Sequence, residues 1–192
     1  MRTKFLALLG LFLLVTFLWA DNPCQSAYGP YGPVTCNTGE TNIVSANGPV
    51  TLNGTTVRQS TSVNGVLTAT KTHLNSLTVN GTVNLVESFI NAETNINGAL
   101  LANSTVFNNT ITISTDNFTL IDTLTKNIIV NGAANGVVAP QILNLKGKTQ
   151  INGNITFTEN DGVVNVGPEV KITGKVIGGQ VKMEPLISKT TT

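Results

Sequence analysis

From residue 42 onward, short runs of alternating apolar and polar residues return along the chain at a nearly constant interval. Several runs share the form Val/Ile-Asn-Gly, and one carries Thr in place of Asn. With Ile113 placed in the one gap, the runs begin at Val63, Val79, Ile96, Ile113, Val130, Ile151 and Ile172. The steps between them are 16, 17, 17, 17, 21 and 21 residues, which predicts one structural repeat per step.

Two further apolar ladders follow the same interval. The second runs through Leu67, Val83, Leu100, Ile155 and Val176. The third is less regular and runs through Leu74, Ile90, Val106 or Phe107, Leu124, Ile142 and Val163 or Val164. Three ladders in one period predict three inward-facing strips in each repeat.

The pattern predicts an all-β fold, a single-stranded parallel β-helix of about seven or eight coils with repeats of 16–21 residues. Helical repeats are excluded because Asn, Thr, Gly and β-branched residues are poor helix formers. A hairpin meander is the alternative, since Asn-Gly is also a strong hairpin signal. Hairpins, however, would not keep three ladders in step, whereas coils stacked about 4.8 Å apart would.

The Asn-Gly pairs and the longer steps predict where each coil bends. We expect the Asn residues to adopt a left-handed corner conformation and to hydrogen-bond along a ladder. The following Gly is expected to take a positive φ angle. The widening after Val130 predicts loops at 133–140 and 159–162.

The N-terminal residues read as a secretory signal peptide, 1–20. Arg2 and Lys4 precede fifteen apolar residues, and Ala20 ends a plausible cleavage site. An uncleaved anchor is the alternative, but that run is short for a bilayer of about 30 Å. No second long apolar segment follows, so we expect a secreted, periplasmic or cell-surface protein without a transmembrane segment after signal removal.

Two cysteines, Cys24 and Cys36, flank a turn-rich stretch directly after the signal. In an exported chain they predict a disulfide that closes an N-terminal cap, 21–41. A reactive thiol pair is the alternative, but it would favour closer spacing and a positive neighbour. The β-helix domain then spans 42–183, and 184–192 forms a flexible tail.

The composition narrows the chemistry. Eleven basic and ten acidic residues provide no basic field, so we expect no nucleic-acid partner. With one histidine and two cysteines, the sequence predicts no metal site, no cofactor and no catalytic set. His73 is expected to face outward at a corner. Asp116, Asp122 and Lys126 come nearest to the acid–base cluster of a carbohydrate-active β-helix enzyme, although solvated charges explain them as well.

The repeats at 77–85, 149–157 and 171–176 resemble those of bactofilins, the polymer-forming β-helical proteins of bacteria. The similarity covers 42–182. It implies a β-helix that assembles through its ends into filaments without nucleotide. Bactofilins are cytoplasmic or bound to the inner membrane face, whereas this chain begins with an export signal.

These observations predict an exported, non-enzymatic structural or surface protein that forms a homo-oligomer through its β-helix ends. The end coil at 176–183 would expose a strand edge, unless Lys182 and Pro185 block it. The first alternative is an adhesin or glycan-binding module that uses the polar Thr/Asn face or the 133–140 loop. The second alternative is a carbohydrate-active β-helix enzyme.

Overall fold

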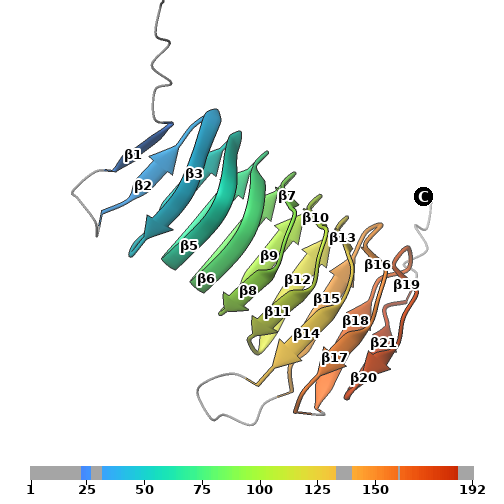
Figure 1. Ribbon diagram of the computed structural model, residues 1–192. Helices are drawn as coiled ribbons and strands as arrows, with labels where there is room; N and C mark the ends of the chain where they lie inside the picture. The colour runs from blue at the N-terminus through green and yellow to red at the C-terminus, as the bar shows by residue number, and fades with distance from the viewer. Residues whose placement is uncertain (1–22, 27–31, 133–139, 160, 186–192) are drawn as a thin grey trace, which may run out of the picture.

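The structure, a computed structural model, describes residues 23–26, 32–132, 140–159 and 161–185. Within these residues every regular element is a strand, and the strands stack into a parallel β-solenoid of about eight turns. Figure 1 shows the coils following one another in chain order, from blue β1 to red β21. The predicted all-β parallel β-helix is confirmed.

Each coil contributes strands to three faces, and two long strands, β5 (Thr55–Thr70) and β6 (His73–Val86), bend through all three. Face 1 holds β2 (Val34–Cys36), β4 (Val50–Asn53), the ends of β5 and β6, β9 (Leu100–Asn103), β12 (Asn117–Ile121), β15 (Ile142–Lys146), β18 (Gly162–Val166) and β21 (Gly179–Met183). Face 2 holds the starts of β3 (Gly39–Ala46), β5 and β6, then β7 (Phe89–Ile90), β10 (Val106–Phe107), β13 (Leu124–Thr125), β16 (Gln150–Ile151) and β19 (Lys171–Ile172). Face 3 holds the rest of β3, the middle of β5 and β6, then β8 (Thr94–Asn97), β11 (Ile111–Ser114), β14 (Ile128–Asn131), β17 (Ile155–Phe157) and β20 (Val176–Ile177).

The core lies inside the coils and is built from stacks of like residues. The first five members of the first predicted ladder, Val63 to Val130, are direct partners in face 3 and are all buried. Leu67, Val83 and Leu100 form the matching stack in face 1, as predicted. Alternation along each strand therefore sorts apolar side chains inward and polar ones outward.

After Val130, the ladders differ from the prediction. The partner of Val130 is Phe157, 27 residues further on, whereas Ile113 and Val130 are 17 residues apart. Ile151 and Ile172 lie instead in face 2, beyond Thr125. The prediction was wrong here because it divided the added residues evenly between two coils. Most of them fall between β14 and β15.

The same shift displaces the other two ladders. Ile155 and Val176 belong to face 3, where Ile155 stacks on Ile128. Leu143 and Val164 continue face 1 rather than the third ladder. Leu124 and Ile142, which we predicted to face inward, point outward, since the inward residue beside each is Thr125 or Leu143.

The corner between faces 1 and 2 has a backbone that the sequence analysis missed. One residue per coil takes a left-handed conformation there over four consecutive coils: Lys71, Glu87, Ser104 and Asp122, with φ between 48° and 54°. Gly54 and Gly147 extend the column at its two ends, with φ of 63° and 57°. Non-glycine residues adopt this region at a cost of about 1–2 kcal/mol, so the closed coil must impose it.

The corner between faces 3 and 1 contains the Asn-Gly pairs. Gly65 and Gly81 have positive φ angles of 153° and 145°, as predicted. The preceding Asn64 and Asn80 lie in ordinary strand conformation, so the prediction of left-handed Asn was wrong. Glycine alone absorbs this bend, because it has no Cβ to collide with the coil below.

Candidate functional site

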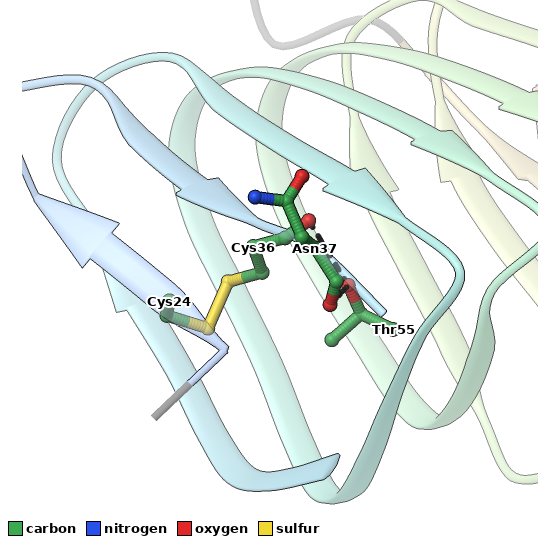
Figure 2. The surroundings of a disulfide bond; sticks show 4 residues. All are labelled: Cys24, Cys36, Asn37 and Thr55. Atoms are coloured by element: carbon green, nitrogen blue, oxygen red, sulfur yellow. Dashed lines mark hydrogen bonds between the residues drawn. A yellow bond between two sulfur atoms is a disulfide. The ribbon is translucent and has the colours of Figure 1, made fainter. Parts of the chain in front are cut away.

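The N-terminal end of the solenoid is closed by a disulfide. Cys24 in β1 (Cys24–Ser26) is bonded to Cys36 in β2, and β1 runs antiparallel along β2 (Figure 2). The Thr55 hydroxyl donates hydrogen bonds to the Cys36 carbonyl at 3.1 Å and to the Asn37 carbonyl at 3.0 Å. The predicted disulfide is therefore present, and it joins β1 to the first coil.

The C-terminal end is built differently. Within the described residues, β19, β20 and β21 each pair with one neighbour only, namely β16, β17 and β18. The main-chain groups along the other edge of these strands have no strand partner in that part of the chain. Such an edge is a template for pairing with another chain.

The side chains that should fill the core are exposed in this last coil. Val181 is 49% exposed and Met183 is 67% exposed. Their direct partners one coil earlier, Val164 and Val166, are 0% and 4% exposed. The apolar cross-section of the solenoid is thus open to solvent at this end, and we take it as the candidate functional site.

The opposite end does not share this exposure. The inward residues Cys36, Val44 and Ala46 of the first coil are 0%, 3% and 7% exposed. The two ends of the solenoid therefore differ chemically: one is covered and cross-linked, and the other is apolar and open.

Lys182 and Pro185, the predicted edge blockers, lie beside this open end. Lys182 is the partner of Asn165 in the outward row of face 1, so its side chain leaves the sheet sideways. Pro185 follows the last strand and belongs to no strand itself. Neither residue pairs with the open edge of β21.

The residues considered for catalysis are not brought together. His73 faces outward at the start of β6, and its ring lies 6.0 Å from that of Phe89, centroid to centroid. Asp116 and Asp122 flank opposite ends of β12, which places them about 20 Å apart along an extended strand. Lys126 follows β13 on face 2. Asp122 instead accepts a hydrogen bond from the Lys148 main-chain N–H at 2.8 Å.

A column of buried hydroxyls was also missed. The residues following the left-handed corner are Thr or Ser in six coils and are almost fully buried: Thr55, Thr72, Ser88, Thr105, Thr123 and Thr149. Several donate to a carbonyl at the end of the preceding strand, for example Thr123 to Ile121 at 2.8 Å. The signal was visible in the sequence as a fourth ladder, but it is polar and therefore does not stand out among apolar positions.

Several predicted features lie outside the described residues. These are the signal peptide at 1–20, most of the 133–140 loop, and the tail beyond Pro185. Residues 158–159 form a turn after β17, within the second predicted loop.

In the part of the chain that the structure describes, no group of three or more His, Cys, Asp or Glu residues is arranged to hold a metal ion. The same part contains no helix of the length and hydrophobicity needed to span a membrane. Comparison with models of known families finds no match, and neither curated proteins nor solved structures yield one.

Proposed function

We propose that this is an exported, non-enzymatic structural protein that associates with a second copy of itself through its C-terminal coil. The observation that carries the proposal is the exposure of Val181 and Met183 beside an unpaired strand edge. Removing apolar surface from water contributes roughly 25 cal/mol per Å². Edge pairing adds main-chain hydrogen bonds.

The geometry favours a pair of C-terminal ends over an unlimited chain. At the N-terminal end β1 occupies the outer edge of β2, so a C-terminal coil could not extend face 1 there. Two C-terminal ends related by a two-fold axis present the same surface to each other, and such a contact closes at a dimer. The resemblance to bactofilins supports association through solenoid ends, and the Cys24–Cys36 disulfide is compatible with a location outside the cytoplasm.

The test is the mass of the chain 21–192 across a concentration series, by sedimentation velocity and light scattering. We expect the mass to rise to that of a dimer. The double variant Val181→Lys/Met183→Lys should remain a monomer at all concentrations, because charged side chains at the contact would have to be desolvated.

Leu101→Lys provides the matched control. Leu101 is 44% exposed and points outward from the middle of face 1, away from both ends. This variant should associate like the wild type. A monomeric wild type at the highest attainable concentration would refute the proposal, as would a double variant that still forms dimers.

A further inference from the structure

The outer surface of face 3 carries a regular polar array over three consecutive coils. Its side chains come from β6, β8 and β11, which are in register. One row contains Thr78, Asn95 and Thr112, and the row beside it contains Asn80, Asn97 and Ser114. Together these residues line a shallow hollow of about 370 Å³, which we call the face 3 hollow.

The hydrogen-bonding groups of this hollow are free. None of its six polar side chains bonds to another group in the described part of the protein. Elsewhere on the solenoid, stacked asparagines satisfy each other: Asn108 donates to Asn91, which donates to Asn75, at 3.4 Å and 3.2 Å. The face 3 hollow therefore offers three carboxamides and three hydroxyls, which can both donate and accept.

The hollow is also uncharged. No Asp, Glu, Lys or Arg occurs in β6, β8 or β11. A polyanion would find no cation in the lining, and a cationic ligand would find no carboxylate. An uncharged chain rich in hydroxyl groups meets the same mixture of donors and acceptors that it carries itself.

The array is rigid and periodic. Each row repeats at the coil spacing of about 4.8 Å, because every member is the direct partner of the next in a parallel sheet. A linear ligand lying along the solenoid axis would meet one carboxamide or hydroxyl from each row at every coil. Pre-ordered side chains lower the entropy lost on binding.

From these observations we infer that the face 3 hollow is a binding site for an uncharged glycan chain. The lining contains no aromatic ring, so each sugar would be held by hydrogen bonds alone. Binding should accordingly strengthen with chain length, as contacts from successive coils add. This site is separate from the C-terminal coil and does not depend on self-association.

The test is a titration of the chain 21–192 with cellohexaose and with chitohexaose, followed by amide chemical shifts. We expect shifts at β6, β8 and β11 with at least one of the two sugars. The double variant Asn80→Ala/Asn97→Ala should bind about tenfold more weakly, because two hydrogen-bonding groups are lost. The control Asn91→Ala/Asn108→Ala, which removes a self-bonded ladder, should bind like the wild type.

Thr78→Val/Thr112→Val is a second variant that keeps β-branched side chains in both strands, in case the Asn variant folds poorly. It should also weaken binding. The inference is overturned if neither sugar produces shifts, if the shifts map to another face, or if both face 3 variants bind normally. Tighter binding of a heparin hexasaccharide would likewise overturn it, since the hollow carries no positive charge.

Discussion

At the scale of single residues, the interior contains two kinds of buried hydroxyl. Thr123 belongs to the corner column and donates to the carbonyls of Ile121 and Ala102. Thr61 and Thr94 occupy inward positions in face 3, and their hydroxyls are buried without a hydrogen-bond partner. Because a buried unpaired hydroxyl costs free energy, threonine helps at the corner and weakens the middle of a face.

This contrast predicts opposite effects of the same substitution. Thr94→Val should raise the free energy of unfolding by about 1 kcal/mol, since it removes an unpaired hydroxyl and keeps the shape. Thr123→Val should lower it by about 1–2 kcal/mol, because carbonyls at the strand end lose their donor. Equilibrium unfolding in urea measures both changes. Equal effects at the two positions would show that the corner hydrogen bonds do not matter.

At the scale of the element, the glycine corner sets how closely the coils approach. A Cβ atom built on Gly81 would lie 2.0 Å from the carbonyl oxygen of Gly65, and one built on Gly98 would lie 2.0 Å from that of Gly81. Since the colliding atoms are main chain, no side-chain adjustment can relieve the contact. The stack of glycines is thus required for the coil spacing at this corner.

We therefore expect Gly81→Ala to destabilise the protein by about 3 kcal/mol or more, through both the collision and the positive φ angle. Ser104→Gly is the control at the left-handed corner. It should be neutral or stabilising by about 0.5 kcal/mol, because glycine adopts that conformation without strain. Thermal or urea unfolding compares the two, and a mild effect of Gly81→Ala would mean that the coils can separate locally.

At the scale of the whole molecule, the solenoid is a one-dimensional stack in which each coil contacts its neighbours only. The two ends therefore carry most of the difference between a stable and a fraying structure. One end is held by the Cys24–Cys36 disulfide, and the other exposes Val181 and Met183. This asymmetry supports an assembly in which the open ends cover each other.

Loss of the disulfide should be felt locally. In Cys24→Ala/Cys36→Ala, the constraint on the unfolded chain disappears, which corresponds to about 2–3 kcal/mol in the loop-entropy description. Hydrogen exchange should accelerate in β1, β2 and β4, while the amides of β12 and β14 keep their protection. Uniform acceleration over all coils would show instead that the solenoid unfolds as a single unit.

The sequence by itself determined the class of fold and the stacking of its regular coils. Val63, Val79 and Ile96 recur at one coil length, and in a parallel solenoid like residues must lie above one another. The same logic applied to the two cysteines, which are close in sequence and have no other partner. Regular spacing therefore translates directly into position.

Only the tertiary structure decided the rest. Beyond Val130 an insertion changes the coil length, and periodicity cannot locate an insertion, so Ile151 and Ile155 were assigned to the wrong faces. The left-handed φ angles at Lys71 and Glu87 arise because the closed coil imposes them against the preference of the residues. Exposure of Met183, likewise, depends on there being no further coil to cover it, which is a property of the stack and not of the repeat.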